Sequence, residues 1–242
     1  MTGQAADIRS GDRPRLSSSD QIVRDVVRGL YEGRFVAGQR LVEPDLMRLY
    51  GVSRGTVREA LKRLAAEGVV SITAFRGAQI RHLSRAEARD LLQLLEVTIG
   101  LAARLAAQNI ASPRTREAFI AACENLSSFA GRGDSFDFVQ ARNRFYRAMT
   151  RAGGNAEVAR AVRGFRVHLI RTYLRPPVEE RFADYREMAE AILNGDAEAA
   201  EAAGRRHIRR SLDALDDAPD SVFAPAGPAQ PGILDDEEFD RG

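Results

Sequence analysis

Apolar residues recur at spacings of three and four along most of the chain, which predicts a mainly helical protein. Residues 41–68 show this spacing in two short segments separated by Gly51 and Ser53. Pro44 suits the first turn of the first segment, Gly51 suits a left-handed helix end, and Ser53 offers an N-cap hydroxyl. The apolar stripe of the second segment comprises Val57, Ala60, Leu61 and Leu64. These signals predict two short helices joined by a tight turn.

The second of these helices also carries a cationic face. Arg54, Arg58 and Lys62 cluster roughly 110° around the helix axis from the centre of the apolar stripe. A helix with a packed back and a cationic, hydrogen-bonding front suits the major groove of B-DNA. We therefore interpret residues 41–68 as a DNA-binding helix–turn–helix. The alternative is an ordinary helical hairpin with a solvated basic face.

Flanking segments complete a winged helix over residues 18–83. A first helix is expected from about Ser19 to Gly33, capped by Ser18 or Ser19. Two short strand-like runs, 69–73 and 78–83, then predict a β-hairpin.

The tip of this hairpin carries Arg76 and Gly77. A glycine allows close approach to the minor groove of DNA, and an arginine is attracted by its negative potential. The alternative is a tip that only turns the chain.

An all-helical bundle is expected over residues 84–216. It opens with a long helix that has a Ser-x-x-Glu capping box at Ser84 and Glu87. Glycine- and proline-containing links separate the later helices, which are predicted at about 114–130, 135–152, 155–174, 178–194 and 196–214.

The two ends of the chain lack helical periodicity. We expect a flexible arm over residues 1–17 and a disordered acidic tail over 217–242. Residues 1–83 carry 14 Arg and Lys against 9 Asp and Glu, whereas 217–242 carry 1 against 7. The basic N-terminal third agrees with contacts to DNA phosphates.

Composition excludes several protein classes. No apolar run approaches the roughly 20 residues of a membrane-spanning helix, and the N-terminal stretch lacks the apolar core of a secretory signal. The single cysteine, Cys123, excludes an intrachain disulfide and a Cys-based zinc finger. We expect a cytoplasmic protein.

The sequence resembles the GntR family of bacterial transcription regulators, in particular its FadR-type branch with an FCD effector domain. The resemblance is carried by GVSRGTVREALKRLAAEG at 51–68 and ILNGDAEAAEAAGRRHI at 192–208. It implies a homodimer that binds a palindromic operator on double-stranded DNA. It also implies release from the operator when a small metabolite, commonly a carboxylate, occupies the helical domain.

By this resemblance the recognition-helix contacts are Ser53, Arg54, Thr56 and Arg58, with Arg76 and Gly77 at the wing. Either arginine of the helix can pair with guanine through a bidentate fork, and the two hydroxyls suit phosphate oxygens. Gly55 stands where the family commonly has threonine. The alternative for Arg58 is a salt bridge to an acid across the domain.

Many relatives bind a divalent metal in the helical domain through an aspartate and three histidines. The matching positions here hold Arg142, Tyr146 and Tyr185, and only the last ligand, His207, remains. A cation and two phenols cannot replace a carboxylate and two imidazoles, because metal ligands must be easily deprotonated. We therefore expect no metal and no cofactor.

The replaced residues suggest a different effector site. Arg142 could clamp a ligand carboxylate bidentately, with hydrogen bonds from Tyr146, Tyr185 and His207. Leu95 and Ile99 stand where relatives usually place Arg and Glu, so the pocket is expected to take an acid with an aromatic or hydrophobic body. In the alternative, Arg142 pairs with Glu96 or Asp184 and holds the bundle together.

Two other functions remain open at this point. One is an enzyme that acts on a small organic acid, with Tyr146, Tyr185 and His207 as acid–base groups. Against it, the sequence shows no nucleophile–base motif and no phosphate-binding glycine loop. The other is an architectural DNA-binding protein that responds to no ligand.

Overall fold

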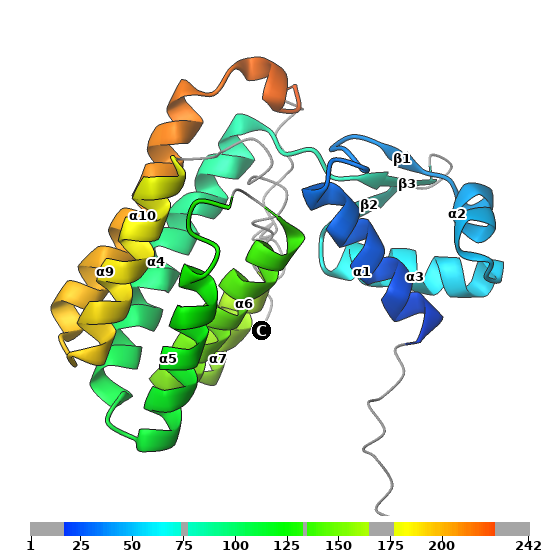
Figure 1. The fold of residues 1–242 in the computed structure, drawn as a ribbon. Helices are drawn as coiled ribbons and strands as arrows, with labels where there is room; N and C mark the ends of the chain where they lie inside the picture. Colours follow the sequence, from blue (N-terminus) through cyan, green and yellow to red (C-terminus); the bar gives the residue numbers. More distant parts are fainter. Residues whose placement is uncertain (1–16, 74–76, 133–134, 165–176, 226–242) are drawn as a thin grey trace, which may run out of the picture.

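The computed structural model describes residues 17–73, 77–132, 135–164 and 177–225. Figure 1 shows a small N-terminal domain beside a larger bundle of helices. The predicted fold class, a winged helix followed by an all-helical domain, is confirmed. Within the described residues, none of the helices combines the length and the apolar character that crossing a membrane requires.

The N-terminal domain packs three helices on a small antiparallel sheet. The strands lie in the order β1-β3-β2, and β2 and β3 form the predicted hairpin, with Thr73 opposite Gly77. The two-residue strand β1 is not predicted from the sequence. In chain order the elements are α1 (Ser18–Tyr31), β1 (Arg40–Leu41), α2 (Glu43–Tyr50), α3 (Arg54–Ala66), β2 (Val70–Thr73) and β3 (Gly77–Ile80).

Helix α1 holds α3 in place through both apolar and polar contacts. Its N-cap is Ser17, not Ser18 or Ser19 as predicted, because the Ser17 hydroxyl forms a capping box with Asp20. The Ser19 hydroxyl, which does not cap the helix, donates instead to the Glu59 carboxylate of α3 at 3.0 Å. All four residues of the predicted stripe on α3 are buried, so the opposite face of that helix points outward.

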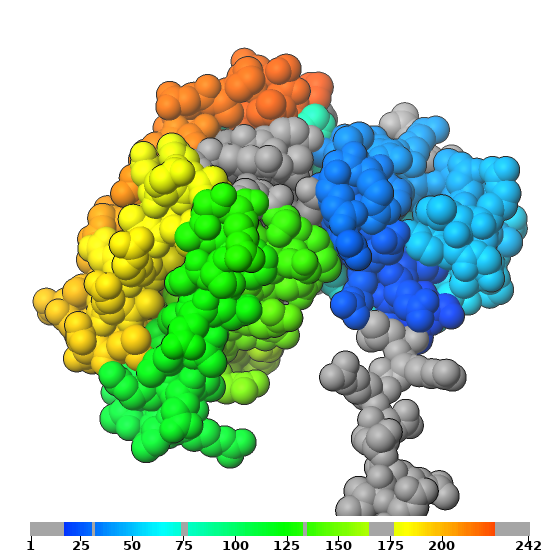
Figure 2. Space-filling model, viewed as in Figure 1, coloured from blue at the N-terminus to red at the C-terminus, as the bar shows by residue number. Residues whose placement is uncertain are grey.

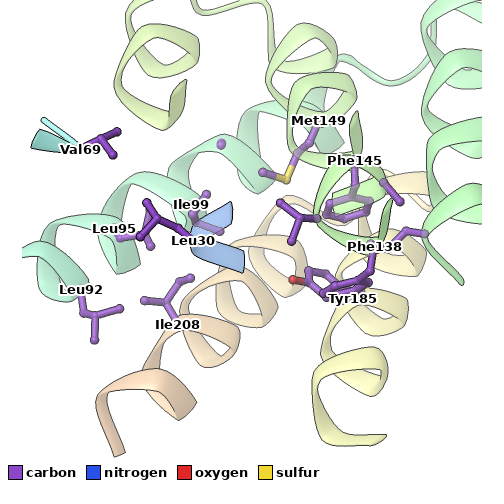
Figure 3. Close-up of a cluster of buried hydrophobic side chains, with 14 of the residues drawn as sticks. Leu30, Val69, Leu92, Leu95, Ile99, Phe138, Phe145, Met149, Tyr185 and Ile208 are labelled. Atoms are coloured by element: carbon purple, nitrogen blue, oxygen red, sulfur yellow. The ribbon is translucent and has the colours of Figure 1, made fainter. Parts of the chain in front are cut away.

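The C-terminal domain is built around the long helix α4, which lies along α10 and also contacts α6, α7 and α9. Figure 3 shows Leu92, Leu95 and Ile99 of α4 facing Ile208 of α10. The elements are α4 (Arg85–Asn109), α5 (Pro113–Ser127), α6 (Phe136–Gly153), α7 (Ala156–Gly164), α9 (Val178–Leu193), α10 (Ala197–Asp217) and η1 (Asp220–Val222). Of the predicted helix at 155–174, residues 165–174 lie outside the described part.

The predicted start of a disordered tail at residue 217 is wrong for 217–225. Helix α10 continues to Asp217, η1 follows, and Phe223 is buried. Arg85 donates to the backbone oxygens of Leu215 and Ala218, forms an ion pair with Asp220 at 2.8 Å, and stacks on the Phe223 ring. These partners lie 130 or more residues from Arg85, so no local pattern reveals them.

Replacing Arg85 with alanine should loosen residues 218–225. The Ala224 amide donates to the Leu83 oxygen at 2.9 Å, so its hydrogen exchange reports whether this segment stays attached. We expect the exchange rate to rise about ten-fold, since a loss of about 1.4 kcal/mol changes an opening equilibrium by that factor. The matched control is Arg89→Ala, which removes only a surface ion pair with Asp216. Equal exchange rates in both variants would contradict the role of Arg85.

Candidate DNA interface and effector site

The hydroxyls of Ser53 and Thr56 lie at the exposed N-terminus of α3. The Ser53 Oγ accepts from the Thr56 amide at 3.2 Å and lies 3.0 Å from the Thr56 Oγ1. Gly51, at φ +63°, ends α2 and turns the chain toward this cap. Both predicted hydroxyls therefore sit beside the backbone amides of a helix start, where phosphate oxygens are favoured.

Arg54 and Arg58 share one partner in this DNA-free structure. Glu43, at the start of α2, lies 3.6 Å from the Nε of Arg54 and 2.9 Å from the Nε of Arg58. The salt bridge that was the alternative role of Arg58 is therefore present. Both arginine side chains nevertheless remain 61% exposed. Exposed ion pairs of this kind contribute little to the free energy of folding. The guanidinium groups are held side by side and accessible.

Glu43 is a residue of this surface that sequence reasoning misses. Its position two residues after a short strand carries no pattern, and its role depends on the contact between α2 and α3. The carboxylate orients two arginines that would otherwise repel each other.

The wing is described only in part. Gly77 has φ +80°, a left-handed conformation that favours glycine, and space around its Cα is open. It pairs with Thr73 at the end of the hairpin. Arg76 lies outside the described residues.

Inside the bundle, polar side chains of α6, α9 and α10 form a connected chain. The Tyr146 hydroxyl lies 2.9 Å from Nε2 of His207, and Nδ1 of His207 lies 3.4 Å from Asp184. Asp184 also accepts from Nε of Arg210 at 3.0 Å. His207 and Asp184 are both buried. The predicted neighbours Tyr146 and His207 are thus brought together.

Tyr146 and Asp184, the two partners of the His207 ring, differ in ionisation. Burial, and next the neighbouring Tyr185, raise the pKa of Tyr146 well above its usual value. Burial alone would raise the pKa of Asp184, but hydrogen bonds and charge from His207 and Arg210 hold it below its ordinary value. Tyr146 therefore keeps its proton, whereas Asp184 is ionised and accepts from His207 and Arg210.

Arg142 and Tyr185 lie at the same cluster. Arg142 is buried, with 4% of its surface exposed, and donates to Oδ1 of Asn143 at 3.3 Å. Its charge acts on the Tyr146 hydroxyl and opposes the rise in that pKa. The ring of Tyr185 lies 4.5 Å from the His207 ring and 5.5 Å from the Phe145 ring. A buried cation thus lies among phenols and aromatic rings.

The acids proposed as alternative partners of Arg142 are engaged by arginines of α10. Asp184 contacts Arg210, and Glu96 lies 2.9 Å from Arg209. Sequence reasoning misses Arg210, whose role arises only where α9 packs on α10.

The residues at the family's metal-ligand positions do not fit a metal ion. Arg142 is a cation, and Tyr146 is a phenol whose hydroxyl is already hydrogen-bonded to the one remaining histidine. In the part of the chain that the structure describes, no three residues of the His, Cys, Asp and Glu types are grouped so that they could hold a metal.

Leu95 and Ile99 are buried, with 4% and 1% of their surfaces exposed. Figure 3 shows them on the side of α4 that faces Ile208, whereas Tyr185 and Phe145 lie further along the same core. Their observed role is packing between α4 and α10. Contact of either residue with an effector remains a prediction.

Two family models match this chain. Residues 18–80 match "Bacterial regulatory proteins, gntR family", and residues 87–210 match the FCD domain. The first range spans α1 to β3, and the second runs from α4 into α10.

Related proteins agree with this assignment. A probable D-xylose utilization operon transcriptional repressor of Paenarthrobacter nicotinovorans is 26% identical over 83% of this chain and 89% of its own. An uncharacterized HTH-type transcriptional regulator, BphR of Paraburkholderia xenovorans, is 47% identical over 62 residues, covering 26% of this chain and 25% of its own.

Two solved structures share the fold. Escherichia coli McbR/YncC has a TM-score of 0.69 at 20% identity and covers 84% of this chain and 98% of its own. A putative GntR regulator of Rhodococcus sp. RHA1 has a TM-score of 0.68 at 18% identity, with coverages of 82% and 97%. The family and its relatives are regulators, so the alternative of an enzyme is not supported. The chain belongs to the GntR family of bacterial transcription regulators and carries an FCD domain as its second half.

Proposed function

We propose that this regulator is a homodimeric repressor that binds a palindromic operator and is released by a small carboxylate with a hydrophobic body. The observation that carries the DNA part is the pair of exposed guanidinium groups on α3, beside a capped helix N-terminus. One domain of this size covers one half-site, so a palindrome needs two copies. The repressor named among its relatives supports repression as the direction of control.

Selection of binding sites from random duplexes tests this function. A regulator should enrich a palindrome whose half-sites lie about one helical turn apart, with a specificity ratio of about 10³ or more over random DNA. Enrichment of no sequence would favour the architectural alternative, which requires only phosphate contacts.

The effector part rests on the buried cluster around Arg142. A buried guanidinium can pair bidentately with a carboxylate, while the rings of Tyr185 and Phe145 offer an apolar wall to the rest of the ligand. Tyr146 and His207 connect this region of α6 to α9 and α10 through hydrogen bonds. A ligand that engages Tyr146 would therefore alter contacts among three helices.

Benzoate and related aromatic carboxylates should raise the melting temperature of the protein, because a ligand that binds only the folded state stabilises it by mass action. At about 100 times its dissociation constant the ligand contributes about 2.7 kcal/mol. Arg142→Ala should abolish this rise, measured against the variant's own baseline, and leave operator binding intact. The matched control is Arg144→Ala on the exposed side of the same helix, which should keep the full response. A full response in the Arg142 variant would restrict that arginine to a structural role.

The dimer is proposed to form through the helical domain. Helix α4 presents three exposed apolar residues along one side, Leu94, Val97 and Leu101, with 59%, 50% and 39% of their surfaces accessible. Their spacing of three and four places them in one stripe, and burying such a stripe favours association.

Light scattering on the full chain should give twice the 26.6 kDa chain mass. The double variant Leu94→Asp/Val97→Asp should give the mass of one chain at micromolar concentration, because two charges would be buried without partners. Leu49→Asp, an equally exposed leucine on α2, should remain dimeric. A double variant that stays dimeric would place the interface elsewhere.

A further inference from the structure

Helices α5 and α6 enclose a groove whose rim is formed by arginines. The groove has a volume of about 500 Å³, with Arg114 on one helix and Arg144, Arg147 and Arg151 on the other. Its floor consists of small apolar side chains, namely Ala118, Ala121, Ala122 and Ala148. Figure 2 shows α5 exposed along the front of the bundle. The groove lies on the side of α6 opposite to the buried Arg142.

The charges of this groove are not neutralised within the described part of the chain. Arg144 donates to the Asn125 amide oxygen at 3.2 Å, and Arg147 donates to the backbone oxygen of Asn143 at 3.3 Å. Among the described residues, none of the four arginines lies within 4.0 Å of a carboxylate, and no acid lines the groove. Elsewhere on the bundle, exposed arginines such as Arg104 and Arg206 do have acidic partners. Four neighbouring cations on an apolar floor suit a polyanionic segment that also carries apolar side chains.

The chain itself contains a segment of this chemistry. Residues 233–240 have the sequence ILDDEEFD, in which five acids stand among three large apolar residues. We propose that the groove formed by α5 and α6 binds residues 233–240, from the same chain or from a second copy. Arginines at the rim would pair with the carboxylates, and the alanine floor would take the apolar side chains.

The connecting chain is long enough for this contact. Residue 224 is attached to Leu83, just before α4 begins. The groove lies toward the other end of α4, whose 25 residues span about 37 Å at 1.5 Å per residue. Residues 233 and 240 lie 8 and 15 residues beyond Pro225, so at roughly 3.4 Å per residue they reach up to about 27 Å and about 51 Å from it. Both an intrachain contact and an exchange between two copies satisfy this limit.

Photo-crosslinking in the full-length protein tests the proposal. Phe239 is replaced by p-benzoylphenylalanine, and the crosslinked peptides are identified by mass spectrometry. We expect crosslinks to peptides of α5 and α6, within one chain or between two as the gel mobility shows. The yield of these crosslinks should fall at least about five-fold when the salt concentration is raised to about 1 M. The Debye length then shrinks to about 3 Å, which screens the attraction between arginines and carboxylates.

Charge reversal identifies the groove. Arg147→Glu/Arg151→Glu should reduce the crosslinks to α5 and α6 by about ten-fold, because two attractions become repulsions. Arg132→Glu, which changes an exposed arginine outside the groove, should leave the yield unchanged. Crosslinks that map to the winged helix, or a yield that the double variant does not alter, would overturn the proposal. The proposal would also be overturned if the double variant kept its crosslinks but bound random duplex DNA more weakly. The groove would then bind DNA phosphates.

Discussion

Replacing both Arg54 and Arg58 with alanine is expected to weaken operator binding by about 100-fold or more. Each side chain is 61% exposed and lies on a flank of α3, beside its buried stripe. A bidentate arginine–guanine pair contributes about 1–3 kcal/mol of discrimination, and about 1.4 kcal/mol corresponds to ten-fold in affinity. Fluorescence anisotropy on the selected operator and on a random duplex of equal length measures both affinities.

The two duplexes distinguish base contacts from phosphate contacts. If the arginines contact bases, the loss on the operator exceeds the loss on random DNA. An equal loss on both would assign them to phosphates. Arg206→Ala, which removes an exposed arginine paired with Glu187 in the bundle, should leave both affinities unchanged. Unchanged affinities in the double variant would contradict the placement of α3 in the major groove.

The local features of the DNA-binding domain could be predicted from the sequence because they obey short-range rules. The cap at Ser53, the left-handed Gly51 and the stripe beginning at Val57 each depend on residues within one or two helical turns. Strand β1 could not be predicted, because two residues carry no periodicity and pair with β3, which lies 37 residues further along the chain.

The effector cluster could likewise be predicted only in part from the sequence. Resemblance to the family identified Tyr146 and His207, which the structure places 2.9 Å apart. Nothing in the local sequence marks Asp184 or Arg210 as their neighbours, because that contact arises from the packing of α9 on α10. The arginine groove likewise requires two helices to lie side by side. Local patterns therefore predict elements well, whereas contacts between elements require the fold.

A close contact between α10 and α4 depends on a glycine. A Cβ atom added at Gly204 would lie 3.1 Å from the backbone oxygen of Ile99 and 3.2 Å from the Cα of Gly100. Both neighbours are backbone atoms of α4, the helix along which α10 packs, so neither can move aside without shifting that helix.

Gly204→Val is therefore expected to lower the free energy of unfolding of the bundle by about 3 kcal/mol, the upper part of the range for overpacking a core. Gly55→Val is the matched control, because its new Cβ would meet only the Ser53 hydroxyl, at 3.7 Å, on an exposed surface. Both residues lie in helices, so the change in intrinsic helix propensity is similar. Thermal unfolding followed by circular dichroism should show a large decrease in melting temperature for Gly204→Val alone. Equal melting temperatures in the two variants would mean that α4 and α10 separate readily to admit the side chain.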